Sequence, residues 1–156
     1  MENFKSFAFP GSAENFTKAM QFISKWEWMD KDDGAFTDHP SDPGGKTKWG
    51  ISQKAYPEIN IASLKKSDAY AIYFADYWLK TGCDLMEFPL ACVTFDTAVN
   101  MGVGKAKAFL EKTKDTSEYI ELRTQRYLEL AQRNPKLKVF LKGWLRRLND
   151  LKKFIG

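Results

Sequence analysis

The segment LACVTFDTAVNM, residues 90–101, is apolar on nearly every side of the helix that its spacing predicts. A helix that is hydrophobic all round lies buried at the centre of a protein. Pro89 precedes the segment at a position that suits the first turn of a helix, and Gly102 follows it as a helix-ending residue. The two polar exceptions, Asp96 and Asn100, are four positions apart and therefore share a face. We expect the rest of the chain to pack around this central helix.

Helical periodicity recurs on both sides of the central segment. Further helices are expected at about residues 12–29, 67–80, 105–112, 117–132 and 137–154, with Ser67 as the N-cap of the second. Residues 30–51 are rich in Asp, Gly and Pro, which favour turns, and two short strands at residues 34–37 and 46–52 could form a hairpin there. The sequence thus predicts a mainly α (α+β) fold, a helical bundle with a small hairpin after the first helix.

Length and composition limit the function classes. The chain has 156 residues, 44% hydrophobic and 28% charged, which is the balance of one globular domain rather than of a disordered chain. No signal peptide and no segment of membrane-spanning length is recognisable, so we expect synthesis in the cytoplasm. The net charge of +4 favours polyanionic partners, which include nucleic acids, anionic membranes and cell walls.

Residue patterns argue against a metal, a cofactor or a nucleophilic triad. Cys83 and Cys92 form no metal-ligand pattern, and we expect two reduced thiols rather than a disulfide. The only histidine, His39, lies in a turn, which leaves no Ser-His-Asp set to propose. Residues 45–47, Gly-Lys-Thr, do not make a phosphate loop, because Pro40 stands where that loop needs a glycine.

The predicted first helix carries a carboxylate on its apolar face. The positions that share this face at helical spacing are Phe16, Met20, Ile23 and Glu27. Burial disfavours the charged form of a carboxylic acid, so an apolar setting would let Glu27 hold its proton near neutral pH. A general acid needs that property. The pattern leaves a second interpretation open, a structural glutamate that is satisfied by an arginine or by backbone amides.

The loop after Glu27 supplies candidates for a second catalytic group. Glycoside hydrolysis needs an acid on one side of the bond and a carboxylate or a positioned water on the other. Spacing alone does not select among the aspartates of this loop, which are Asp30, Asp32, Asp33, Asp38 and Asp42.

Several ordered motifs resemble glycoside hydrolase family 108, the lysozyme-like muramidases of bacteriophages and prophages. The sequences FISKWE at residues 22–27 and PSDPGGKTKWGIS at residues 40–52 carry the resemblance, and the D-P-G-G-x-T-x-W-G-I block is its most specific part. The stretches IYFADYW at residues 72–78 and FDTAVNMG at residues 95–102 match as well. Residues 123–149 are similar to the helical peptidoglycan-binding extension that often follows this domain.

The resemblance implies roles for individual residues. Glu27 matches the catalytic acid, and Asp42 and Thr47 would position the attacking water or stabilise the developing positive charge. Substrate contacts are expected from Trp49, Asp38, Asn100 and Tyr77, and structural support from Asp96, Gly44, Gly45 and Gly50. One departure is clear: Pro40 lies thirteen positions after Glu27, where the family has about seven. The inserted residues put in question how the helix ends and which aspartate faces the substrate.

The expected function is that of a peptidoglycan muramidase, an endolysin without cofactor that cleaves the β-1,4 bond between N-acetylmuramic acid and N-acetylglucosamine. We expect a monomer that is made in the host cytoplasm and acts on the wall after release, with a catalytic core at residues 1–112 and a C-terminal extension at residues 113–156. The alternatives are a lytic transglycosylase, a peptidoglycan-binding or export-accessory protein without turnover, and a nucleic-acid binder. Only the charge supports the last of these, and we expect no nucleic-acid partner.

Overall fold

The computed structural model describes residues 12–41 and 43–156. Its longer helices are α1 (Ser12–Trp28), α2 (Lys66–Tyr73), α3 (Phe88–Met101), α4 (Val103–Lys112), α5 (Thr116–Arg133) and α6 (Lys138–Ile155). Two short strands, β1 (Thr47–Lys48) and β2 (Ile51–Ser52), form an antiparallel hairpin. Shorter helical turns are η2 (Ile61–Ser63), η3 (Phe74–Leu79), η4 (Cys83–Leu85) and η5 (Pro135–Leu137). The predicted mainly α fold with a small hairpin is confirmed.

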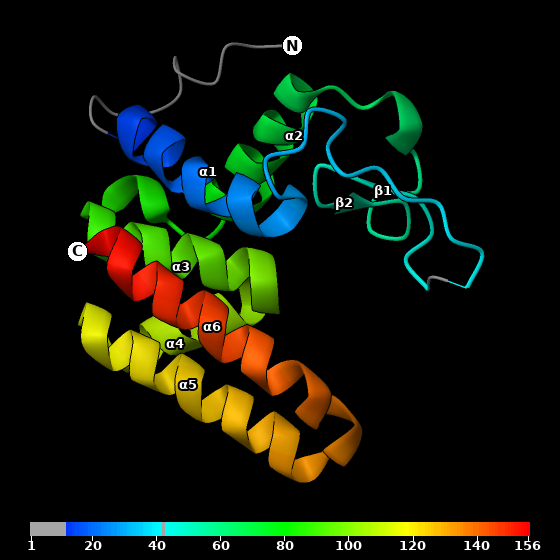
Figure 1. The fold of residues 1–156 in the computed structure, drawn as a ribbon. Helices are drawn as coiled ribbons and strands as arrows, with labels where there is room; N and C mark the ends of the chain where they lie inside the picture. Colours follow the sequence, from blue (N-terminus) through cyan, green and yellow to red (C-terminus); the bar gives the residue numbers. More distant parts are fainter. Residues whose placement is uncertain (1–11, 42) are drawn as a thin grey trace.

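Helix α3 lies in the middle of the molecule, as its composition predicts. Figure 1 shows it between α1 on one side and the helices α4, α5 and α6 on the other. Every residue from 91 to 98 is buried. The prediction of a central helix is therefore confirmed, and the side chains of this helix are placed to meet groups from both halves of the chain.

The apolar face of α1 packs on α3 through an aromatic cluster. The Phe16 ring lies 5.1 Å from Phe74, 5.6 Å from Trp78 and 5.7 Å from Phe95, measured between ring centroids. Aromatic pairs at such distances contribute about 0.5–1.5 kcal/mol each beyond the area that they bury. These contacts hold α1 in place along α3, with its C-terminal end directed toward the hairpin (Figure 1).

The inserted segment after α1 forms an ordered turn. Met29 and Asp30 both adopt positive φ, 52° and 53°, which ends the helix. The backbone N–H of Asp30 donates to the Ser24 carbonyl, and the Ser24 hydroxyl donates to the Asp30 carboxylate at 2.7 Å. Gly34, also at positive φ, lies flat against Trp49, where an added Cβ would come within 2.5 Å of the indole. The insertion therefore docks the hairpin on the end of α1.

The hairpin differs from its prediction, because both of its strands fall within residues 46–52, which were expected to form a single strand. Thr47 pairs with Ser52 and Lys48 with Ile51, and the two residues between the strands, Trp49 and Gly50, have φ of 55° and 72°. Positive φ at both positions is typical of a type I′ turn. Of the strand expected at residues 34–37, the structure retains one bridge, between Thr37 and Thr47.

The second helix differs from its prediction at both ends. It begins at Lys66, and the Asp68 carboxylate accepts a hydrogen bond from the Lys65 N–H, so the prediction of Ser67 as N-cap is wrong. The carboxylate of Asp68, one position after Ser67, thus provides the hydrogen-bond acceptor for the free N–H at the start of the helix. Beyond Tyr73 the helix widens into the π-helical segment η3, which propensity does not predict. Such π-segments occur often at functional sites.

The C-terminal helices α5 and α6 lie side by side and cover α3 (Figure 1). Leu148 and Leu151 of α6 are buried against the core. A functional division of the chain after residue 112 remains a prediction, but the two parts are in direct contact. Among the described residues, no helix combines the length and the hydrophobicity needed to cross a bilayer.

Candidate active site

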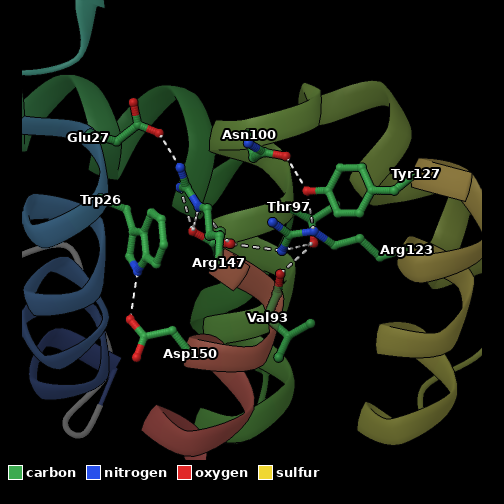
Figure 2. Close-up of polar contacts among 10 residues, drawn as sticks. Trp26, Glu27, Val93, Thr97, Asn100, Arg123, Tyr127, Arg147 and Asp150 are labelled. Atoms are coloured by element: carbon green, nitrogen blue, oxygen red, sulfur yellow. Dashed lines mark hydrogen bonds and ion pairs between the residues drawn. The ribbon is translucent and has the colours of Figure 1, made fainter. Parts of the chain in front are cut away.

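Glu27 lies in the last turn of α1, next to the hairpin. Its side chain is 22% exposed, and its Oε1 accepts a hydrogen bond from Arg147 Nη1 at 2.8 Å (Figure 2). The expectation of an apolar setting for this carboxyl is therefore wrong. Helix α6 runs antiparallel along the C-terminal half of α1, where Phe154 contacts Phe22 and Asp150 contacts Trp26. It thereby brings the guanidinium of Arg147 to Glu27. This agrees with the alternative interpretation, a glutamate that is satisfied by an arginine.

Arg147 joins two carboxylates. Besides Glu27, it binds Asp96 through Nη2 at 2.7 Å and through Nε at 3.2 Å. Burial works against the charge of the guanidinium, but the negative charges of Asp96 and Glu27 outweigh it and raise the pKa of Arg147 above its usual value. Arg147 therefore stays charged and fixes the position of α6 relative to both α1 and α3.

Asp96 lies at the centre of this network, as expected for a residue with a supporting role. Its carboxylate is fully buried and has a second cationic partner, Arg123 Nη1 of α5, at 2.8 Å. Burial acts to raise the pKa of Asp96, yet the guanidiniums of Arg147 and Arg123 together hold it below its ordinary value. The two arginines and the two carboxylates, Asp96 and Glu27, form a cluster with no net charge.

The network continues from Arg123 to the C-terminal end of α3. Arg123 Nε donates to the Tyr127 hydroxyl at 3.0 Å, and Nη1 donates to the Thr97 hydroxyl at 3.1 Å. The Tyr127 hydroxyl in turn donates to Oδ1 of Asn100. Figure 2 shows Glu27 and Asn100 at the two ends of this chain of contacts, with the arginines between them.

The turn of the hairpin packs against the second oxygen of Glu27. A Cβ added to Gly50 would lie 2.4 Å from Oη of Tyr73 and 3.3 Å from Oε2 of Glu27, so only a glycine allows this approach. The Tyr73 hydroxyl donates to the Trp49 carbonyl at 2.8 Å, which anchors the turn. Burial raises the pKa of Tyr73, and the negative charge of Glu27 adds to the effect. Oε1 of Glu27 thus meets Arg147, and Oε2 faces the hairpin.

A family model described as Glycosyl hydrolase 108 matches residues 22–102, which contain Glu27, the hairpin, Asp96 and Asn100. The chain belongs to glycosyl hydrolase family 108. The solved structure of Brucella abortus SagA is similar, with a TM-score of 0.71 and 24% identity over 92% of this chain and 94% of that chain. At that identity the likeness shows the fold alone. No curated protein matches the chain.

As a member of this family the protein is a glycoside hydrolase. Its hairpin contains three of the other predicted site residues, Thr47, Trp49 and Gly50. Thr47 lies in β1, where its backbone pairs with Thr37. Asp38 is exposed in the loop before it. Within residues 12–41 and 43–156, neither the Thr47 nor the Asp38 side chain hydrogen-bonds to Glu27. Asp42, predicted as the second catalytic group, lies outside the described residues, and its role stays a prediction.

The predicted glycines shape the loop. Gly45 has a φ of 69°, and an added Cβ there would meet only Gln53, at 3.7 Å. The Gly44 carbonyl accepts a hydrogen bond from the Lys54 N–H at 3.1 Å. Of the three glycines, Gly50 is the one that touches Glu27, so its support is direct, whereas Gly44 and Gly45 act on the course of the loop.

The two predicted aromatic contacts differ in their surroundings. Tyr77, in η3, is partly buried with its ring 5.7 Å from Tyr73. Burial raises the pKa of Tyr77, and the negative charges of Asp76 and Glu27 add to the effect. Trp49 is only 7% exposed, and its indole N–H donates to the Leu64 carbonyl at 2.8 Å. Trp49 therefore packs in the core in this structure, and sugar binding by it stays a prediction.

The site is defined by its polar network and not by a large hollow. Hollows of about 560 Å³ and 460 Å³ lie elsewhere and are lined by none of the predicted site residues. In the described parts of the chain, no three His, Cys, Asp or Glu side chains gather into a metal site.

Sequence reasoning missed Arg147 and Arg123, although a signal for both exists. Arg147 is three positions after Trp144 and four before Leu151, so it falls on the apolar stripe of its helix. Arg123 stands likewise four positions before Tyr127, which is buried. An arginine on an apolar stripe predicts a buried ion pair, because a buried charge needs a partner.

Proposed function

We propose that the chain is a muramidase that hydrolyses the β-1,4 bond between N-acetylmuramic acid and N-acetylglucosamine in peptidoglycan, with Glu27 as the proton donor. The observation that carries the proposal is the position of Glu27 inside the region that matches the family, partly exposed, with one oxygen held by Arg147 and the other beside the hairpin turn. A general acid needs a fixed orientation toward the leaving oxygen.

The ion pair with Arg147 is compatible with proton donation. Because Arg147 binds Oε1, the proton of the acid form can reside on Oε2 without breaking that contact. Oε2 faces Gly50, so the glycosidic oxygen would approach from the hairpin side. Arg147 also binds Asp96 at 2.7 Å, so the guanidinium is held in place independently of Glu27.

The second group is proposed to come from the hairpin loop, with Asp42 and Thr47 as candidates for positioning the attacking water. A carboxyl separation of about 5–5.5 Å corresponds to retention of configuration, and about 6.5–9.5 Å to inversion. The anomeric form of the first product, measured by NMR, distinguishes these outcomes. An anhydro product, measured by mass spectrometry of released muropeptides, would identify a lytic transglycosylase instead.

We further propose that the protein acts as a monomeric phage or prophage endolysin that is made in the host cytoplasm and reaches the wall after release. Support comes from the sequence motifs that resemble such muramidases. The ion pair of Glu27 favours one competing function, a peptidoglycan-binding protein without turnover, because a paired carboxylate is also what a purely structural role requires.

The decisive experiment is the clearing of a purified peptidoglycan suspension by wild type and by Glu27→Gln. The variant keeps size and hydrogen bonding but cannot donate a proton, so we expect a rate loss of about 10²- to 10⁴-fold. Glu14→Gln, an exposed position on the same helix, is the matched control and should clear at the wild-type rate. Equal rates for Glu27→Gln and wild type would refute the assignment of the acid. Wall binding without clearing by wild type would establish the binding protein.

A further inference from the structure

A small hollow lies at the far end of the Glu27 network from the catalytic acid. It has a volume of about 180 Å³ and is formed where α3, α4, α5 and α6 meet. Its lining includes Asn100 and Tyr127, the last two members of the network, together with Lys105, Arg126 and Trp144. We call it the α3–α6 hollow. Nothing in the assignment of Glu27 uses it.

The lining of the hollow carries positive charge only. Lys105 and Arg126 are partly buried at its wall, and no aspartate or glutamate lines it. The carboxylate nearest to Arg126, that of Glu129, is 3.5 Å away, but it is 52% exposed and lies outside the lining. Two half-buried cations without an acidic neighbour in the wall favour an anion, and a guanidinium suits a carboxylate or a phosphate.

One wall of the hollow is flat and aromatic. The rings of Tyr127 and Trp144 stack at 5.1 Å with an angle of 19° between their planes, and Phe140 continues the stack at 6.0 Å. Phe140 is 54% exposed, so the stack reaches the surface. Aromatic faces bind apolar groups, peptide planes and sugar faces. The preferred ligand therefore joins an anionic group to a compact, partly apolar body.

Asn100 connects the hollow with the catalytic side of the molecule. Its Oδ1 accepts from Tyr127, and its amide nitrogen is turned away from Tyr127, toward the Glu27 end of the network (Figure 2). An amide nitrogen offers two donors. Asn100 therefore belongs both to the lining of the hollow and to the hydrogen-bond network that ends at Glu27.

We propose that the α3–α6 hollow is a subsite for a carboxylate of the peptidoglycan stem peptide. The proposal rests on the muramidase function, because the stem peptide is attached to the muramic acid whose glycosidic bond would be cleaved. That peptide combines free carboxylates with small apolar side chains and peptide planes, which matches the charge and the aromatic wall. Lys105 and Arg126 bind its carboxylate, and Tyr127 and Trp144 pack against its backbone.

The test measures the binding of a soluble disaccharide-peptide to Glu27→Gln protein, which removes turnover from the experiment. The doubly substituted K105Q/R126Q form should bind about tenfold more weakly, since it loses charge-assisted contacts to the carboxylate. The control pair K107Q/R133Q removes the same charge from exposed positions of the same two helices and should change binding less than about twofold. Amidation of the ligand's carboxylates should weaken binding to the parent protein and leave K105Q/R126Q unaffected.

A second measurement uses protein without a substitution in the hollow, so its result does not depend on whether the double variants fold. The indole N–H signal of Trp144, assigned with Trp144→Phe, should shift when the disaccharide-peptide binds to Glu27→Gln protein. An unshifted signal at saturation, or equal weakening by the two double substitutions, would overturn the subsite. Stronger competition by glycerol phosphate than by the carboxylate ligand would also overturn it, in favour of a phosphate site.

The muramidase proposal and the subsite proposal can be refuted independently of each other. If wild type cleaves peptidoglycan but K105Q/R126Q binds the disaccharide-peptide as tightly as its parent, the subsite is wrong and the muramidase stands. If the ligand binds in the hollow with carboxylate dependence but wild type releases no muropeptides, the subsite stands and the proposed turnover is wrong.

Discussion

Nη1 of Arg147 lies 2.8 Å from Oε1 of Glu27, although 120 positions of sequence separate the two residues. The contact makes the last helix part of the candidate active site. Because the same guanidinium binds the buried Asp96, it joins α1, α3 and α6 at one point. This junction should therefore affect both the activity and the stability of the protein.

Replacement of Arg147 should impair both stability and activity. Among the described residues, Arg147→Met leaves the buried Asp96 with one cationic partner, Arg123, and we expect a loss of about 3 kcal/mol in the free energy of unfolding. Glu27 loses the contact that orients it, so the clearing rate should fall as well. Urea unfolding and wall clearing measure the two effects. Arg146→Met, an exposed neighbour, serves as the control, and equal behaviour of the two variants would contradict the role of Arg147.

The hairpin glycine beside Glu27 should tolerate no side chain. Gly50→Ala places a Cβ 2.4 Å from the Tyr73 hydroxyl and 3.1 Å from Cβ of Glu27, at a φ of 72°. Gly45→Ala meets the same strain of positive φ with only an ordinary contact, 3.7 Å to Gln53, and is the matched control. We expect Gly50→Ala to be less stable than Gly45→Ala by about 1–3 kcal/mol, the usual cost of overpacking. Thermal unfolding compares the two, and similar melting temperatures would refute the close approach.

Acid should weaken the fold through Asp96. Because its pKa in the folded protein is held below the ordinary value, ionised Asp96 contributes stability above its unfolded pKa of about 3.9. That contribution is lost as the pH falls through the lower folded pKa. Asp96→Asn should therefore be destabilised by about 3–5 kcal/mol near pH 7, with the difference from wild type narrowing below about pH 3.9. Urea titrations at several pH values measure this. A difference that stays constant with pH would exclude an ionised Asp96.

A chain truncated after Lys112 should not fold cooperatively. It would lack both Arg123 and Arg147, which leaves the fully buried Asp96 without a cationic partner, and it would expose the face of α3 that α5 and α6 cover. Circular dichroism and thermal unfolding of residues 1–112 test this. A sharp unfolding transition would instead support a catalytic core that is independent of the C-terminal extension.

Local features of the fold were predictable because they depend on neighbours in sequence. The central helix at residues 88–101, the first helix and the turn-rich region after it follow from periodicity and from helix breakers. The N-cap of α2 was misplaced by two positions, at Ser67 instead of Lys65, because the Asp68 carboxylate accepts the hydrogen bond from the Lys65 N–H. The π-helical widening at residues 74–79 follows from packing and has no propensity signature.

The surroundings of individual side chains were less predictable. Trp49 follows a loop and was expected to meet substrate, but Gly34, folded back by the inserted segment, makes room for its indole in the core. Arg147 falls on the apolar stripe of the last helix, but the pattern does not tell which carboxylates it meets. In both cases the side chain's surroundings depend on a contact with a residue that lies outside its own stretch of sequence.

Spacing along the chain encodes which residues share a face, so most helices, a hairpin after the first helix, the family resemblance and Glu27 as the candidate acid could be predicted from it. The surroundings of Glu27 depend on contacts between segments that are distant in sequence. The angle at which α6 crosses α1 and α3 depends on the packing of many side chains at once. That packing brings Arg147 between Glu27 and Asp96, so the carboxyl chosen for its apolar face lies instead at the edge of a neutral cluster of charges.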